Sequence, residues 1–86
     1  MDIQIYSRNG CKECQRTKRL LIFKNMPFQE TKLGRDIADR QQFMQEITAK
    51  TGKKINALPQ VFVDGKHIGD FKATARHFQI DPKSVP

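Results

Sequence analysis

The sequence Gly10-Cys11-Lys12-Glu13-Cys14 contains the only two cysteines of this 86-residue chain. The pair follows a short apolar stretch and opens a predicted helix. A disulfide between residues so close in sequence closes a very small loop, and the stabilisation that a disulfide provides grows with the length of its loop. The two thiols are therefore better suited to chemistry, in which one thiol attacks a disulfide and its neighbour resolves the mixed intermediate.

The length predicts one small domain, residues 1–86, that buries roughly 60–65% of the surface exposed by its unfolded chain. Such a domain has one core and no large internal cavity, so we expect its chemistry at the surface. Sixteen Lys and Arg against nine Asp and Glu give a net charge of +7, which favours acidic partners. The basic residues are scattered and no nucleic-acid motif accompanies them, so we expect no specific nucleic-acid binding.

Neither a targeting segment nor a membrane span is predicted. The N-terminus has no basic region followed by an apolar core, as a secretory signal would have. The longest aliphatic-aromatic run, residues 20–23, is too short to cross a membrane. We therefore expect a soluble, cytoplasmic protein. In that reducing compartment a close cysteine pair is more often catalytic or metal-binding than structural.

The predicted order of elements is strand-helix-strand, helix, hairpin, helix. Strands are predicted at residues 2–6, 28–33, 60–63 and 66–68, and helices from 11 or 12 to 24, from 36 or 39 to 52, and from 70 to 81. Asp64-Gly65 lies between the last two strands and is the preferred chemistry of a two-residue hairpin turn. The buried stripe of the first helix is predicted from helical spacing, and consists of Cys14, Thr17, Leu20 and Leu21.

The second helix is predicted from its cap and its apolar face. Asp39 with Gln42 three residues later resembles a capping box. Phe43, Met44 and Ile47 recur at helical spacing, and we interpret all three as core residues.

The position of Cys11 predicts that it is the nucleophile. At the start of a helix, free backbone N–H groups and the helix dipole favour an anion, and Arg8 and Lys12 add positive charge while Glu13 opposes them. These effects lower the pKa of a thiol, and the thiolate is the reactive form. Cys14, one turn into the helix on a more buried face, should keep its proton until it attacks, which makes it the resolving thiol.

A metal site is the main alternative use of the two cysteines. A close pair next to a strand-helix-strand pattern is a redox signal. Zinc needs four ligands, and the only histidines, His67 and His77, are ten residues apart, whereas finger-like sites place theirs closer. We therefore expect no metal site within one chain, and interpret His67 as an exposed strand residue and His77 as a helix-surface residue. Purely structural cysteines and a cluster bridging two chains remain open alternatives.

Two further motifs lie before and after the cysteine pair in the sequence. Residues 5–8 read Ile-Tyr-Ser-Arg, and residues 58–69 read Leu-Pro-Gln-Val-Phe-Val-Asp-Gly-Lys-His-Ile-Gly. With them the chain resembles a glutaredoxin over nearly its whole length, and is most similar to the compact glutaredoxin/thioredoxin-like proteins that phages encode. The resemblance implies an α/β thioredoxin fold, in which a four-stranded mixed sheet is flanked by about three helices. If the protein is phage-encoded, it would act in the host cytoplasm.

The resemblance also implies a substrate groove beside the cysteines. Pro59 matches a proline with a cis peptide bond that lies against the pair, and Leu58 would offer backbone hydrogen bonds to a bound peptide or to glutathione, as an added strand does. Arg8 matches a basic residue that favours the thiolate and the glutathione carboxylate. Tyr6 matches an aromatic position beside the site, and Gly69 matches the first glycine of a Gly-Gly pair that lets the backbone approach glutathione.

The chain departs from the family pattern at three places. Lys12-Glu13 replaces the usual Pro-Tyr between the cysteines, so the thiol pKa and reduction potential cannot be carried over; Lys12 stays a candidate for contact with substrate. Ala57 replaces a common threonine. Asp70 replaces the second glycine, and is predicted either to contact glutathione or to cap the helix that follows.

The predicted function is that of a dithiol-disulfide oxidoreductase without a tightly bound cofactor, acting as a monomer. It would reduce protein disulfides or glutathione mixed disulfides, with glutathione as co-substrate, and the resemblance implies ribonucleotide reductase as a client. Recycling by a thioredoxin reductase is the alternative to glutathione. A non-catalytic binding subunit with the same fold is the alternative to an enzyme.

Overall fold

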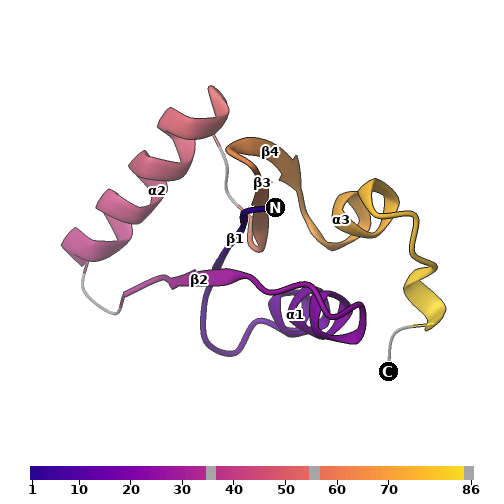
Figure 1. Ribbon diagram of the computed structural model, residues 1–86. Helices are drawn as coiled ribbons and strands as arrows, with labels where there is room; N and C mark the ends of the chain where they lie inside the picture. The colour runs from indigo at the N-terminus through magenta and orange to yellow at the C-terminus, as the bar shows by residue number, and fades with distance from the viewer. Residues whose placement is uncertain (35–36, 55–56, 85–86) are drawn as a thin grey trace.

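Four strands form one mixed sheet in the computed structural model, which describes residues 1–34, 37–54 and 57–84. They are β1 (Ile3–Ser7), β2 (Gln29–Lys32), β3 (Gln60–Val63) and β4 (Lys66–Gly69). Their order across the sheet is β2-β1-β3-β4 (Figure 1). β1 is parallel to β2 and antiparallel to β3, and β4 is antiparallel to β3. The predicted mixed sheet is therefore confirmed.

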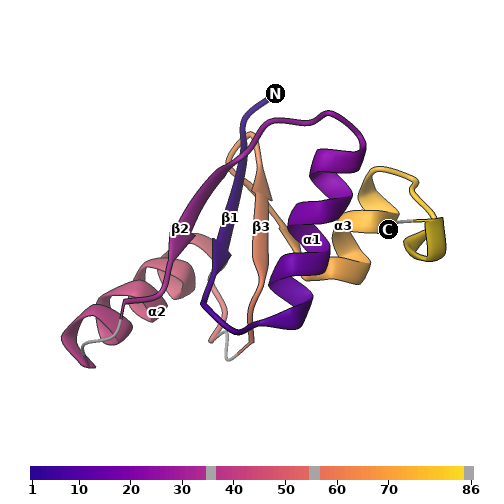
Figure 2. The same cartoon turned by 90° about the horizontal axis from the view of Figure 1, so that it is seen from below.

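Helices cover both faces of the sheet. Over the described ranges they are α1 (Lys12–Phe23), α2 (Ile37–Thr51) and α3 (Phe71–His77), followed by a short 3-10 helix, η1 (Pro82–Ser84). The two views place α1 and α3 together on one face and α2 on the other (Figure 1, Figure 2). This is the architecture that the resemblance implied. None of the helices in the described parts of the chain is long and apolar enough to cross a membrane.

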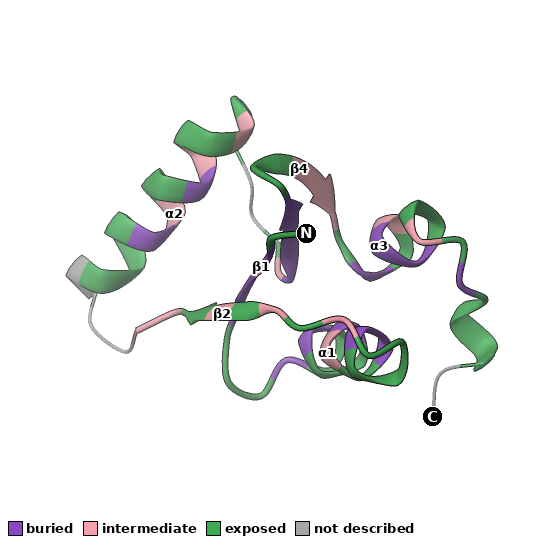
Figure 3. Ribbon diagram, viewed as in Figure 1, coloured by how far each residue is buried: buried purple, intermediate pink, exposed green. Residues whose placement is uncertain are grey.

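The interior is divided into two cores, one on each face of the sheet, rather than forming the single core that was predicted. Buried segments accordingly lie on the helices of both faces (Figure 3). The larger core, on the side of α1 and α3, is built from Ile3, Ile5, Leu20, Leu21, Val61, Val63, Phe71, Ala75 and Ile80. The smaller core, on the side of α2, is built from Tyr6, Phe43, Ile47 and Phe62. Successive strand residues point to opposite faces, so β1 and β3 each contribute to both cores.

The hairpin turn has the geometry that its sequence predicts. Asp64 and Gly65 both have positive φ, at 51° and 81°, as the two central residues of a type I′ turn require. The turn also fixes the N-terminus, because the Asp2 amide donates to the Asp64 carboxylate at 2.7 Å and the Asp64 amide donates to the Asp2 carbonyl at 2.7 Å.

Three local predictions were wrong. The last helix ends at His77 rather than at residue 81, because Gln79 adopts a left-handed φ of 56° that a helix cannot continue through. α2 begins at Ile37, so Asp39 lies inside its first turn and is not the N-cap residue of a capping box; the alternative start at residue 36 lies outside the described residues. His67 is half-buried rather than exposed, because its ring packs against Phe62 at a centroid distance of 5.2 Å.

The packing of α1 predicts that substitutions at Leu20 and Ile22 differ strongly in their effect on stability. Leu20→Ala should lower the free energy of unfolding by about 2–5 kcal/mol, because it leaves a cavity in a core that cannot fully collapse; Leu20 is fully buried. Ile22→Ala is the matched control, since Ile22 is 63% exposed and its loss should change stability by no more than about 0.5 kcal/mol. Urea unfolding of both variants would measure this, and equal losses would contradict the assignment of the core.

Candidate active site

Cys11 caps the N-terminus of α1 with its sulfur. Its backbone is extended, with φ −93° and ψ 111°, and its Sγ accepts a hydrogen bond from the Cys14 amide at 3.2 Å. Gly10, at φ +75°, supplies the left-handed turn just before it. An N-cap acceptor satisfies one of the backbone N–H groups that a helix start leaves free. The Cys11 sulfur therefore lies where the backbone favours negative charge.

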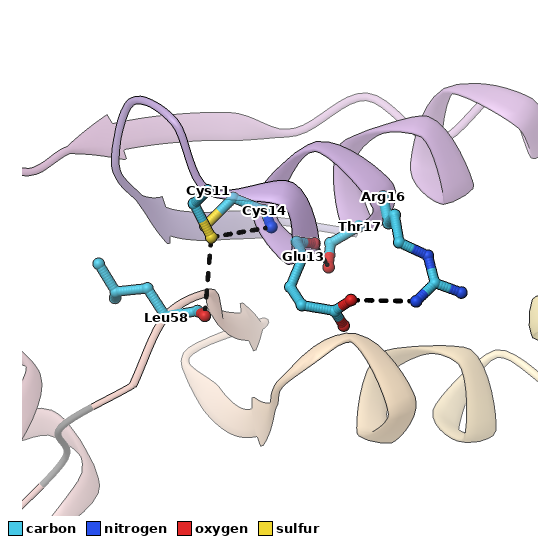
Figure 4. A network of polar contacts seen from close by, with 6 residues as sticks. All are labelled: Cys11, Glu13, Cys14, Arg16, Thr17 and Leu58. Carbon is cyan, nitrogen blue, oxygen red and sulfur yellow. Dashed lines mark hydrogen bonds and ion pairs between the residues drawn. The ribbon is translucent and has the colours of Figure 1, made fainter.

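The second partner of this sulfur comes from a distant part of the chain. The Cys11 thiol donates to the Leu58 carbonyl at 3.8 Å (Figure 4). The peptide bond between Leu58 and Pro59 is cis, as the resemblance implied. The loop before β3 and the start of α1 thus meet at Cys11, and the backbone of Leu58 lies next to the sulfur.

Both cysteines are free thiols and both are buried, with 7% of Cys11 and 1% of Cys14 exposed. Burial raises the pKa of the Cys14 thiol to about 12, and a hydrogen bond to Cys11 adds to this effect, whereas the backbone amide of Arg8 acts in the opposite direction. Cys14 is therefore protonated at neutral pH. This agrees with the expectation that Cys14 keeps its proton.

Charged side chains surround the start of α1. Arg8 and Lys12 are both exposed, and Arg8 lines a surface pocket of about 360 Å³ together with Arg40 of α2. Glu13 points away from the two sulfurs and pairs with Arg16 at 3.0 Å (Figure 4). The negative charge of Glu13, between the two cysteines, is thus paired with the positive charge of Arg16 on the same helix.

The glutaredoxin family model matches residues 3–68 of the chain. The chain belongs to the glutaredoxin family. Glutaredoxin 3 of Escherichia coli K12 is 34% identical over 68 residues, which cover 79% of this chain and 75% of that protein. Glutaredoxin 1 of the same strain is 34% identical over 74 residues, covering 83% of this chain and 85% of that protein.

Solved glutaredoxin structures share the fold. Glutaredoxin 1 from Francisella tularensis, crystallised with cacodylate, superposes with a TM-score of 0.78 at 34% identity, covering 91% of this chain and 92% of that one. A buckwheat glutaredoxin-glutathione complex superposes with a TM-score of 0.75 at 25% identity, covering 90% and 67%. This glutaredoxin is therefore a thioredoxin-fold thiol-disulfide oxidoreductase.

Tyr6 lies in the smaller core of this glutaredoxin, with 2% of its surface exposed. Its hydroxyl donates to Glu46 at 2.9 Å and accepts from Lys50 at 2.5 Å, both on α2. Its ring meets the rings of Phe43 and Phe62 edge-on, each at 5.5 Å. This burial argues against the direct contact with a bound substrate that the resemblance suggested for Tyr6.

Gly69 and Asp70 form the junction between β4 and α3. Gly69 has φ +128°, and a Cβ at this position would lie 3.0 Å from the Cβ of Ala73, so a side chain would be both strained and crowded. The Asp70 carboxylate accepts from the Ala73 amide at 3.0 Å. The prediction that Asp70 caps this helix is confirmed, and contact with glutathione remains a prediction.

Sequence reasoning missed the side chain that supports the Leu58–Pro59 loop. Gln60 is 6% exposed; its Nε2 donates to the Ala57 carbonyl at 3.0 Å, and its Oε1 lies 2.6 Å from His67 Nε2. The one available signal was a long polar residue at the start of an apolar strand. The pKa of His67 is lowered by its burial and by the charge of Lys53, so its neutral form is favoured.

The raised pKa of Cys14 predicts slow alkylation. At pH 9, near the ordinary pKa of a thiol, iodoacetamide should label Cys14 about 100-fold or more slowly in the folded, reduced protein than in urea, because only the thiolate reacts. Trypsin cleavage after Lys12 separates the two cysteines, so mass spectrometry reads each one alone. Labelling of folded Cys14 within tenfold of the urea control would contradict the prediction.

Proposed function

We propose that this glutaredoxin reduces disulfides with both thiols, Cys11 as the nucleophile and Cys14 as the resolving thiol. The difference between the two sulfurs supports this assignment. Cys11 Sγ accepts a hydrogen bond from the Cys14 amide at the start of α1, the end of a helix at which an anion binds favourably, and an attacking thiol reacts as its thiolate. Cys14 is buried and protonated, so it is poorly suited to make the first attack.

The proposed reaction has two exchange steps. The Cys11 thiolate attacks one sulfur of the substrate disulfide, forming a mixed disulfide and releasing the other half as a thiolate. Cys14 then gives up its proton, which ends on the departing sulfur or in solvent, and attacks Cys11 Sγ. The Cys11–Cys14 bond forms, the bond to the substrate breaks, and two electrons have passed to the substrate.

Attack by Cys14 becomes easier once the first step has occurred. Burial is the largest cause of the raised pKa of Cys14, the hydrogen bond and charge of Cys11 add to it, and Arg8 acts in the opposite direction. When Cys11 is bonded to substrate, its sulfur carries neither a proton nor a charge, so its contribution is lost. Burial still raises the pKa of Cys14, but the loss of the Cys11 contribution brings the pKa closer to its ordinary value.

We propose that the substrate binds along the loop that ends in Pro59. The Leu58 backbone lies beside the Cys11 sulfur and would hydrogen-bond an extended substrate chain. Arg8 and Lys12 would attract a carboxylate, and Gly69 leaves room for close approach of the substrate backbone. Asp70 would face the substrate amine with the part of its carboxylate that is not used in capping.

We propose glutathione as the co-substrate, because a buckwheat relative was solved as a glutathione complex. Two glutathione thiols would reduce the Cys11–Cys14 disulfide and leave as one glutathione disulfide. Ribonucleotide reductase is the protein client that we propose, and the reducing cytoplasm is the compartment in which such a pair would work. A thioredoxin reductase is the alternative source of electrons. It is considered because Asp70 replaces the second glycine of the pair that lets the backbone of family members approach glutathione.

Serine variants test the two roles. Cys11→Ser should abolish reduction of every disulfide, because no nucleophile remains. Cys14→Ser should lose reduction of protein disulfides but retain activity on glutathione mixed disulfides, in which a second glutathione resolves the intermediate. Turnover assays with both substrate types would measure this, with unfolding curves as the control for folding. Near-normal turnover by Cys11→Ser would rule out the proposed assignment and favour a non-catalytic binding role.

A coupled assay tests the electron donor. Turnover of one disulfide substrate should be supported by glutathione with glutathione reductase, and should be at least about tenfold slower with thioredoxin reductase alone. Asp70→Asn keeps a good capping residue but removes the charge; it should raise the KM for glutathione about two- to fivefold, the range of an exposed ion pair. Faster turnover with thioredoxin reductase would reverse the assignment.

A further inference from the structure

A partly buried carboxylate joins the two sides of the loop that carries Cys11. Glu30 of β2 accepts a hydrogen bond from the Ser7 hydroxyl at 2.5 Å, and the same oxygen, Oε2, lies 2.9 Å from Lys18 Nζ. Ser7 is the last residue of β1 and Lys18 is on α1. Glu30 therefore ties the strand before the loop to the helix after it. β1 and β2 run side by side with α1 on one face of them (Figure 2).

The contacts of Glu30 are those of an ionised group. Partial burial acts to raise the pKa of Glu30, but the hydrogen bonds from Ser7 and Lys18 lower it more, so the pKa lies below its ordinary value. Ser7 is fully buried, and the side chains of Lys18 and Glu30 are 26% and 21% exposed. Hydrogen bonds to a charged group in such a site are short and strong, unlike those of a fully exposed ion pair.

The positions of these residues relate them to Cys14 rather than to the substrate. Lys18 follows Cys14 by four residues, so both lie on the same side of α1. Arg8 follows Ser7 directly, and its backbone acts against the burial that raises the pKa of Cys14. The Ser7 carbonyl is also fixed, since it accepts from the Leu33 amide at 2.8 Å. The exposed residues 8–10 between Ser7 and Cys11 are thus held at their start by β2.

We propose that Glu30 is a positioning residue for the resolving step, holding Ser7 and Lys18 so that Cys14 stays aligned with Cys11 Sγ. The inference rests on the proposed role of Cys14. In the step concerned, the Cys14 thiol loses its proton, the Cys11–Cys14 bond forms and the Cys11–substrate bond breaks. The substrate leaves as a thiolate when the proton passes to solvent, or as a thiol when its sulfur takes the proton. Loss of the Glu30 carboxylate loosens the loop and slows this step, while the first attack by Cys11 is preserved.

Reduction of dithio-bis-nitrobenzoate separates the two steps in the full-length protein. Attack by Cys11 releases one coloured thiolate, and attack by Cys14 on the resulting mixed disulfide releases the second. In Glu30→Ala the second release should slow about five- to tenfold, as expected when an attacking group loses part of its orientation. The first release should stay within about twofold of the wild-type rate. Lys18→Gln, which keeps the Ser7 contact, should show a smaller slowing and provides the test if Glu30→Ala fails to fold.

Glu46→Gln is the matched control. Glu46 also accepts from a hydroxyl, that of Tyr6 at 2.9 Å, and lies 3.6 Å from a lysine, Lys50, but on the opposite face of the sheet. Both releases should stay within about twofold of wild type in this variant. Equal slowing in Glu46→Gln and Glu30→Ala, or an unchanged second release in Glu30→Ala and Lys18→Gln, would overturn the proposal. A second release that persists in Cys14→Ser would instead overturn the dithiol role on which it rests.

Discussion

The hydrogen bond from the Cys14 amide to the Cys11 sulfur is the interaction on which the site depends. Helices usually begin with an oxygen acceptor from Ser, Thr, Asp or Asn, but α1 begins with a sulfur. The same atom thus caps the start of a helix and contacts the Leu58 carbonyl of a distant loop. The local fold of α1 and the position of the Cys11 sulfur therefore depend on each other.

The two-sided sheet explains how this sulfur meets its neighbours. α1 and α3 pack on one face through the larger core, to which α1 contributes Leu20 and Leu21, whereas the smaller core under α2 has partly buried Leu58 packed against it. Cys11 lies where these two packing units meet, because its thiol contacts the Leu58 carbonyl. A site placed at such a boundary is held from both sides by ordinary apolar packing.

Features encoded by neighbouring residues could be predicted from the sequence. The cysteine pair, the Asp64-Gly65 turn and the buried stripe of α1 each depend on spacing within one element. The start of α2 was harder, because an aspartate is favourable both as a cap and within the first turn of a helix. The roles of Glu30, Gln60 and Tyr6 could not be predicted, since each depends on a partner from another element. The alternation of apolar and polar residues predicted that Tyr6 lies in the first strand. It could not show whether the Tyr6 side chain faces the core or a bound substrate.

The order of the strands leaves β2 and β4 at the margins of the sheet. β2 reads Gln-Glu-Thr-Lys and β4 reads Lys-His-Ile-Gly, and each spans only four residues. Short outer strands that carry charged side chains resist pairing with the backbone of another molecule. The charges of Glu30 and Lys32 in β2 and of Lys66 in β4 thereby protect the open margins against self-association and fibril growth.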